Sequence, residues 1–187
     1  ELRYDERPVA SLFGLCRKQR VIYLGTLSKV MFPGIRMAYL VLPEDLVDAF
    51  VIGNSELYRG GRMPEQAALA EFIDEGYFTA HIKRMRSVYH ERRDTLRQAM
   101  ESRLGNAGSV LGGHAGLQLL YRFNQPVDDA LIAAQSLAEG VVCRPLTMYY
   151  VNQALSEPGL NLGFAAVPVK NIEPAVDTLV RVIERHL

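Results

Sequence analysis

Lys29 is the residue whose type and neighbours most clearly suggest chemistry. It lies in the segment TLSKVMFPGIR, after Thr26 and Ser28 and seven residues before Arg36. A lysine in a partly desolvated pocket has a lowered pKa, and its neutral amine can form a Schiff base with an aldehyde. Hydroxyl and guanidinium groups beside that amine suit a phosphate, because both donate hydrogen bonds to its oxygens. The amine, hydroxyl and guanidinium groups of this segment therefore suit the binding of a phosphorylated aldehyde. The alternative interpretation is a plain loop whose lysine faces the solvent.

Two short apolar runs flank these residues and must position them. Residues 21–25 (VIYLG) and 37–42 (MAYLVL) each predict a buried strand. The connection between them is a loop marked by Pro33 and Gly34 rather than a helix. We therefore expect the two strands to be antiparallel neighbours, with Lys29 held between them.

Three helical patterns follow the second apolar run. PEDLVDAFVIG begins with proline and acidic residues, and PEQAALAEFIDEG ends at Gly76, as is typical of helix termini. Residues 77–104 predict the longest helix, with an apolar stripe on one side. Its outward residues are expected to be basic: Lys83, Arg84, Arg86, Arg92 and Arg93. A solvated helix face is the simpler interpretation of them, and an anion or DNA contact is the alternative.

The sequence after Gly105 predicts a second structural unit. Its order is strand (115–123), helix (127–140), strand (141–146), strand (160–167) and a terminal helix (171–187). This order indicates a compact α+β lobe behind the long helix. We place a domain junction inside that helix, which divides the chain into residues 1–80 and 81–187.

Composition narrows the function classes. The chain has 187 residues, 49% of them hydrophobic, and 21 basic side chains balance 21 acidic ones. Zero net charge argues against a dedicated nucleic-acid or membrane-surface module. We find no apolar run long enough to span a bilayer and no signal peptide. Cys16 and Cys143 lack the spacing of a disulfide framework or zinc site, and His81 and His90 do not share a metal-binding face. A cytoplasmic protein without a metal site is expected.

The segment VIYLGTLSKVMFPGIRMAYLVLP resembles the lysine-bearing segment of fold-type I aminotransferases, whose pattern is roughly Ser/Thr-x-Ser-Lys, a short loop and Gly-x-Arg-x-Gly/Ala-Tyr. Together with RYDERP, PEQAALAEFIDEGYFTAHIKRMRSVYHERRDTL and GGHAGLQLLYRF, it resembles the MocR-type regulators across nearly the whole chain. These proteins join a GntR-like winged helix-turn-helix to an aminotransferase-like domain. The implied fold is α/β and α+β. Residues 1–80 would end a large domain with an antiparallel strand pair plus helices, and residues 81–187 would form the small C-terminal α+β domain.

The same resemblance implies roles for individual residues and partners. Lys29 would form the internal aldimine with pyridoxal 5′-phosphate, and Thr26 and Arg36 would hold the phosphate, with Ser28 as a further candidate. The family's partners for the cofactor ring, most of its large domain and its DNA-binding domain would lie upstream of these residues. The resemblance also implies a homodimer, an amino-acid-like effector or substrate, and DNA contact only through the upstream domain.

One departure from the family concerns ligand recognition. Amino-acid-specific members of the fold have an arginine in an Arg-Leu-Ser-Phe-like strand that binds the substrate carboxylate. In this sequence the equivalent stretch is LNLGF, and Asn161 stands where that arginine would be. An amide cannot supply a cationic bidentate contact. Arg144, in the neighbouring strand, is a candidate substitute, and a surface arginine at a strand end is the alternative.

Three hypotheses about function follow. The favoured one is a ligand-sensing regulator whose cofactor-binding part biases a DNA-binding domain. The second is a stand-alone class I aminotransferase that depends on pyridoxal phosphate, in which Lys29 also moves a proton. The third is a folded fragment that is inactive by itself, because the partner of the cofactor's ring nitrogen would lie outside residues 1–187.

Overall fold

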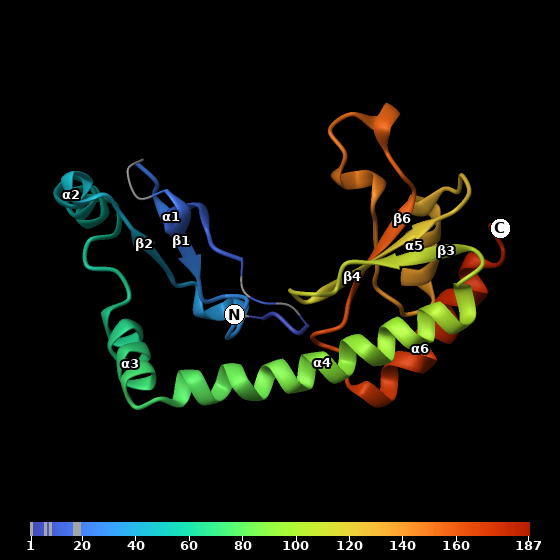
Figure 1. The fold of residues 1–187 in the computed structure, drawn as a ribbon, viewed down its shortest axis with the longest axis horizontal. Coiled ribbons are helices and arrows are strands. Elements are labelled where there is room, and N and C mark those ends of the chain that lie inside the picture. Colours follow the sequence, from blue (N-terminus) through green and yellow to red (C-terminus); the bar gives the residue numbers. More distant parts are fainter. Residues whose placement is uncertain (1, 6, 8, 17–19) are drawn as a thin grey trace. The chain divides into compact units, whose positions relative to one another are not determined.

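The computed structural model describes residues 2–5, 7, 9–16 and 20–187. They form two compact units, whose elements are labelled in Figure 1. Unit 1 comprises the described part of residues 7–83, and unit 2 comprises residues 84–187 together with residues 2–5. The division falls inside the longest helix, α4 (Tyr77–Leu104), whose extent agrees with the helix predicted from the sequence.

Unit 1 contains a two-stranded sheet that leads into two helices. β1 (Tyr23–Thr26) pairs with β2 (Ala38–Val41) in antiparallel register, as expected, and Gly25 faces Tyr39. A Cβ atom on residue 25 would lie 2.2 Å from the Tyr39 ring, so glycine is needed for the ring to lie across β1. The other elements of this unit are α1 (Leu12–Leu15), η1 (Pro33–Ile35), η2 (Glu44–Leu46), α2 (Val47–Tyr58) and α3 (Met63–Asp74).

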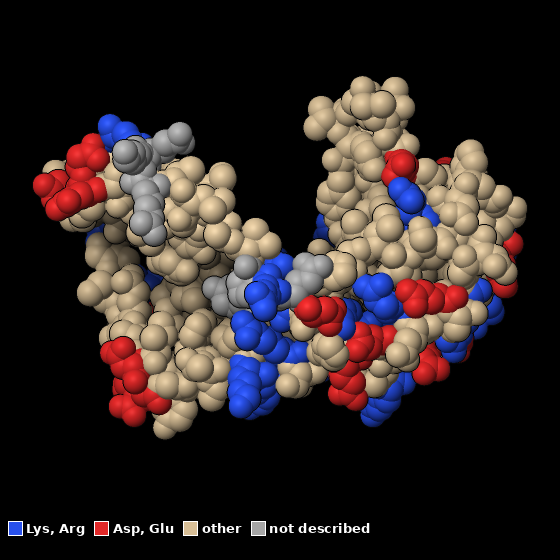
Figure 2. Space-filling view, viewed as in Figure 1, with Lys and Arg blue, Asp and Glu red and all other residues tan. Residues whose placement is uncertain are grey.

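The expectation that both strands of unit 1 are buried is wrong. All of β2 is exposed, and in β1 only Gly25 is buried. An apolar groove of about 1110 Å³ runs along β2, α2 and α3, with Tyr39, Phe50 and Leu57 in its lining. Much of the surface of this unit in Figure 2 accordingly carries neither acidic nor basic side chains. Residues 37–42 are apolar, but no layer of the described chain covers β2.

Unit 2 contains a four-stranded antiparallel sheet in the order β3-β4-β6-β5. Its elements are β3 (Gly108–Leu111), β4 (Gln118–Phe123), α5 (Asp129–Ala138), β5 (Arg144–Pro145), η3 (Thr147–Tyr149), η4 (Gln153–Leu155), β6 (Gly159–Gly163) and α6 (Val169–Ile183). The order of strands and helices after α4 agrees with the prediction, except that β3 was not expected. β5 is shorter than predicted, because Pro145 has no N–H to continue the ladder.

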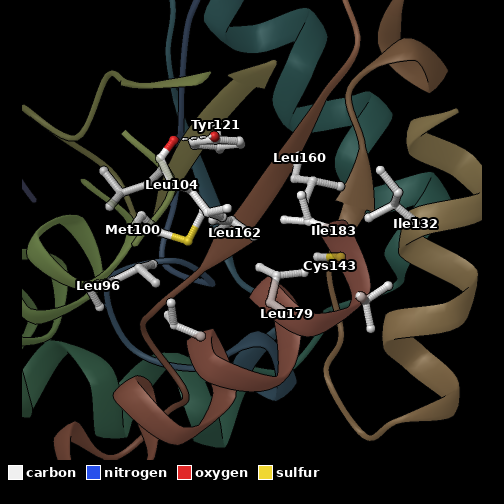
Figure 3. Packing of buried hydrophobic residues seen from close by; sticks show 14 of the residues in the cluster. Leu96, Met100, Leu104, Tyr121, Ile132, Cys143, Leu160, Leu162, Leu179 and Ile183 are labelled. Atoms are coloured by element: carbon white, nitrogen blue, oxygen red, sulfur yellow. Dashed lines mark hydrogen bonds between the residues drawn. The ribbon is translucent and has the colours of Figure 1, made fainter. Parts of the chain in front are cut away.

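One face of this sheet packs against α4, α5 and α6 and forms the core of unit 2 (Figure 3). Met100, Leu119, Ile132, Leu160 and Val182 are fully or almost fully buried there. The Tyr121 hydroxyl donates to the Leu104 carbonyl oxygen at 2.8 Å, and burial raises the pKa of Tyr121 to about 12. This hydrogen bond joins β4 to the end of α4.

Residues 2–5, the N-terminal strap, pack on unit 2 although the sequence continues into unit 1. The Tyr4 amide donates to the His114 carbonyl at 3.0 Å, and the Gly116 amide donates to the Leu2 carbonyl at 2.8 Å. The Tyr4 hydroxyl also donates to the Gly116 carbonyl at 2.7 Å. Leu2 is only 7% exposed. The strap thus lies along the turn that precedes β4.

Arg93 fixes this strap to α4 and corrects an expectation from the sequence. The long helix was predicted to turn Arg93 outward, but its side chain is only 5% exposed. It donates to both carboxylate oxygens of Asp5, to Asp94 and to the Gly113 carbonyl, and its guanidinium carbon lies 5.0 Å from the centre of the Tyr4 ring. A buried arginine needs such partners, because an unpaired charge in the interior is strongly unfavourable.

Candidate functional site

The turn after β1 positions Lys29. Leu27 and Val30 are 9% and 7% exposed and anchor the turn, whereas Lys29 between them is exposed. The Leu27 amide donates to the Met37 carbonyl at 3.1 Å, which ties the turn to the start of β2. His81 of α4 donates through Nε2 to the Val30 carbonyl at 3.0 Å. Two buried side chains and two hydrogen bonds thus hold the turn, and Lys29 is exposed on it.

Thr26 and Ser28 sit on the N-terminal side of this turn. The Ser28 amide donates to the Thr26 hydroxyl oxygen at 3.3 Å. This contact occupies an acceptor site on Thr26 and leaves its O–H proton available to another group. Thr26 is exposed and Ser28 is half-buried, so Thr26 is the more accessible hydroxyl of the two.

Arg36 follows the short helix η1 and has a left-handed backbone conformation, with φ of 49°. Positive φ is uncommon for a residue with a side chain, and it ends η1 and redirects the chain into β2. The preceding residue, Ile35, is buried, and its carbonyl accepts a hydrogen bond at 3.1 Å from Arg62, the N-cap residue of α3. Packing and hydrogen bonding therefore fix the backbone next to Arg36, while its guanidinium is exposed.

These residues form a donor set that fits a phosphorylated aldehyde. Lys29 supplies a primary amine, Thr26 a free hydroxyl proton and Arg36 a guanidinium. Within residues 20–187 and the shorter described stretches, neither Lys29 nor Arg36 has a side-chain hydrogen bond or ion pair, so both are available to a ligand. The expectation of a partly desolvated Lys29 is not met in this structure, because the lysine is exposed although the two residues that anchor its turn are buried.

The second group of candidate residues lies on the other sheet. Arg144 of β5 faces Asn161 of β6 in the antiparallel register, and Arg144 is exposed. The Asn161 side chain donates through Nδ2 to the Tyr149 hydroxyl oxygen at 3.5 Å, and its Oδ1 is buried and accepts no hydrogen bond from described residues. Arg144 likewise has no side-chain partner in the described part of the chain. The cofactor candidates thus belong to unit 1 and the ligand candidates to unit 2.

Other classes of site find no support among the residues that the structure describes. No group of three or more histidine, cysteine or acidic side chains is arranged there to hold a metal ion. Every helix in the described ranges is too short or too polar to cross a bilayer.

The family model for aminotransferase class I and II matches residues 3–179. The chain belongs to this family. Among curated proteins, this aminotransferase-family chain is 34% identical to the probable rhizopine catabolism regulatory protein MocR of Rhizobium meliloti, over 96% of its own length and 36% of that protein. It is 33% identical to the uncharacterized HTH-type transcriptional regulator YhdI of Bacillus subtilis, over 87% of this chain and 37% of that protein. The predicted similarity to MocR-type regulators is confirmed, and the chain spans about a third of these relatives.

Solved aminotransferases have the same fold. LysN, an α-aminoadipate aminotransferase of Thermus thermophilus complexed with N-(5′-phosphopyridoxyl)-L-leucine, superimposes with a TM-score of 0.86 at 25% identity. The match covers 98% of this chain and 48% of that chain. This confirms the prediction that the aminotransferase-family chain has the fold of the C-terminal part of a fold-type I aminotransferase.

Some residues that shape the two sites were not found from the sequence. His81 was considered only as a metal ligand, yet it holds the lysine turn. Asp129 is 2% exposed and accepts hydrogen bonds from Thr147 and Gly159, at the two ends of the loop that carries Tyr149. A buried aspartate at the start of a helix resembles an ordinary N-terminal acid in a sequence, so only its tertiary contacts distinguish it.

Proposed function

We propose that this chain is the C-terminal part of a pyridoxal 5′-phosphate-binding, aminotransferase-like effector domain of a GntR/MocR-type transcriptional regulator. The observation that carries the proposal is the exposed Lys29 on a turn anchored by buried Leu27 and Val30, with free donors on Thr26 and Arg36. The similarity to MocR and YhdI favours a regulator. A stand-alone class I aminotransferase is the second candidate, favoured by the close superposition on LysN.

Each residue of the proposed site has a specific task. Lys29 would hold the cofactor covalently through its amine. Arg36 would neutralise the phosphate and orient it with two or more N–H donors, and Thr26 would add its hydroxyl proton, with Ser28 as a further donor. When bound, the cofactor's pyridine ring supplies an electron sink. Arg144 and Asn161 would meet the carboxylate of an amino-acid-like effector or substrate.

Regulation would follow from linkage between ligand binding and domain arrangement. A ligand that binds one arrangement more tightly shifts the population toward it, and the shift is limited by the ratio of the two affinities. We propose that the assembly is a homodimer in the cytoplasm and that DNA contacts come from an N-terminal domain outside this chain.

Labelling at Lys29 tests the cofactor proposal. We expect incubation with pyridoxal 5′-phosphate followed by borohydride reduction to add one covalent label at Lys29, because reduction makes the amine–aldehyde linkage permanent. Lys29→Ala should lose the label. Lys170→Ala, which removes an exposed lysine of α6, should keep it. Intact mass and peptide mapping measure the outcome, and equal labelling of the wild type and Lys29→Ala, or none in a folded wild-type chain, contradicts the proposal.

The phosphate contact makes a separate prediction. Arg36→Gln should raise the apparent Kd for pyridoxal 5′-phosphate about tenfold to a hundredfold, because hydrogen bonds to charged groups contribute about 1.5–3 kcal/mol. Absorbance titration at fixed pH gives this Kd. Arg59→Gln is the matched control, since Arg59 is also exposed and has a positive φ, of 45°. If both substitutions raised the Kd equally, the proposed contact between Arg36 and the phosphate would be contradicted.

A further inference from the structure

The outer face of the unit 2 sheet brings donor groups of different strands together. Strand residues alternate between faces, and Leu160 and Leu162, on either side of Asn161, point into the core. Asn161 therefore faces away from the core. Its register partner Arg144 lies on the same outer face, and so does Leu120 of β4. Arg144 and Asn161 are thus cross-strand neighbours on a surface that α4, α5 and α6 do not cover.

A third residue reaches this face from the loop between β5 and β6, and that loop is held at both ends. Asp129 accepts from the Thr147 amide at 3.1 Å, from the Thr147 hydroxyl at 2.6 Å and from the Gly159 amide at 3.0 Å. Within the loop, Gln153 donates to the Tyr150 carbonyl at 2.8 Å. Residues 146–156 carry no charge, and the projecting part of this loop appears uncharged in Figure 2. These contacts fix the backbone that carries Tyr149.

The contact between Asn161 and Tyr149 determines what the phenol can do. With Nδ2 donating to the Tyr149 oxygen at 3.5 Å, the buried Oδ1 is one unpaired acceptor. If the amide were turned over, two N–H donors would be buried without partners instead, which is less favourable. The Asn161 side chain therefore has Nδ2 toward Tyr149, and the Tyr149 hydroxyl oxygen accepts this hydrogen bond. Its own O–H proton is left for another group, and Tyr149 is 54% exposed.

We propose that Tyr149 is a ligand-binding residue that donates its O–H proton to a carboxylate held by Arg144, with Asn161 orienting the phenol. The inference rests on the proposed function, because it assigns the carboxylate end of the amino-acid-like ligand to this face. The Arg144 guanidinium has donors only, and the Tyr149 oxygen already accepts from Asn161, so both groups present donors to a ligand. They therefore select an anionic acceptor over an ammonium group. The neutral Asn161 contributes no charge. The site thereby combines a cation from β5 with a hydroxyl from the neighbouring loop.

A titration with acetate tests this assignment without any cofactor. The full 187-residue chain is titrated at constant ionic strength, and the Arg144 Nε–H and Asn161 side-chain NMR signals are followed. We expect saturable shifts with acetate and none with acetamide. Tyr149→Phe should raise the Kd for acetate about tenfold or more, because it removes one hydrogen bond to an anion. Tyr150→Phe is the matched control and should leave the Kd unchanged.

Two further observations separate the possible failures. Arg144→Gln should abolish the shift of the Asn161 signal, whereas an unchanged Kd in Tyr149→Phe would overturn the role of the phenol. Absence of any acetate-dependent shift in the folded wild type would overturn the carboxylate site as a whole. Because labelling at Lys29 is measured separately, its failure with a normal acetate titration would reject the cofactor proposal alone.

Discussion

Arg93→Ala is expected to lower the free energy of unfolding by about 3 kcal/mol and to release the N-terminal strap from unit 2. The side chain is almost fully buried, and its removal deletes the contacts with Asp5 and Asp94 and leaves the buried Gly113 carbonyl without its donor. Losing a buried, charge-assisted network of this kind costs about 3–5 kcal/mol. The lower end applies here, because Asp5 is 43% exposed and regains water.

Hydrogen exchange measures the release of the strap directly. The Tyr4 amide is bonded to the His114 carbonyl in the native structure, and it should lose most of its protection in Arg93→Ala. Arg181→Ala is a suitable control, since Arg181 is an exposed residue of α6 that bonds only Thr178 among described residues. Its expected effect on stability is within about 0.5 kcal/mol. Unchanged Tyr4 exchange in Arg93→Ala would show that the strap is held by its backbone contacts alone.

The same contact gives the strap a pH dependence. Hydrogen bonding from Arg93 holds the pKa of Asp5 below its ordinary value. A carboxylate with a lowered native pKa stabilises the fold fully above its unfolded pKa, near 3.9, and loses this contribution as the pH falls through the native pKa. Protection of Tyr4, corrected for intrinsic exchange, should therefore stay constant from neutral pH to about pH 5 and fall below pH 4. In Arg93→Ala the same acid step should be absent.

The sequence alone predicts helix bounds and strand pairing correctly where several local signals agree. The bounds of α4 follow from its long 3.6-residue pattern and from Gly76 before it, which has a φ of 79°. The antiparallel pairing of β1 and β2 follows from two apolar runs joined by a short loop. Lys29, Thr26 and Arg36 lie within one segment, so a sequence motif indicates them together, and their roles stay predictions.

The sequence was insufficient where the outcome depends on distant residues. An apolar run predicts a buried strand only if something covers it, and no described residue covers β2. Arg93 lies in a basic stretch of helix, and only Asp5, far away in the sequence, shows why it is buried. β3 is a short strand in a glycine-containing stretch whose sequence does not indicate a strand. It is a strand because it pairs with β4.

Asp129→Ala is expected to lower the free energy of unfolding by about 3–4 kcal/mol, because Asp129 is 2% exposed and holds both ends of the loop from β5 to β6. Its loss leaves the Thr147 amide and hydroxyl and the Gly159 amide without an acceptor. Each unsatisfied buried donor costs about 1–3 kcal/mol. Asp129→Asn should cost about 2 kcal/mol, since the amide keeps one accepting oxygen but turns N–H donors toward another donor. Urea unfolding measures both values, and exchange at the Gly159 amide reports the loop itself.

The neighbouring Asp128 provides a control that separates loop anchoring from helix capping. Asp128 is the exposed N-cap of α5 and accepts from the Leu131 amide at 2.9 Å. Asp128→Ala should therefore cost only about 1 kcal/mol and leave exchange at Gly159 unchanged. If Asp129→Ala cost no more than Asp128→Ala, the loop would be ordered without Asp129. If the cost is larger, Asp129→Asn should also weaken acetate binding in the folded chain, because Tyr149 can donate to a carboxylate beside Arg144 only while its loop is held.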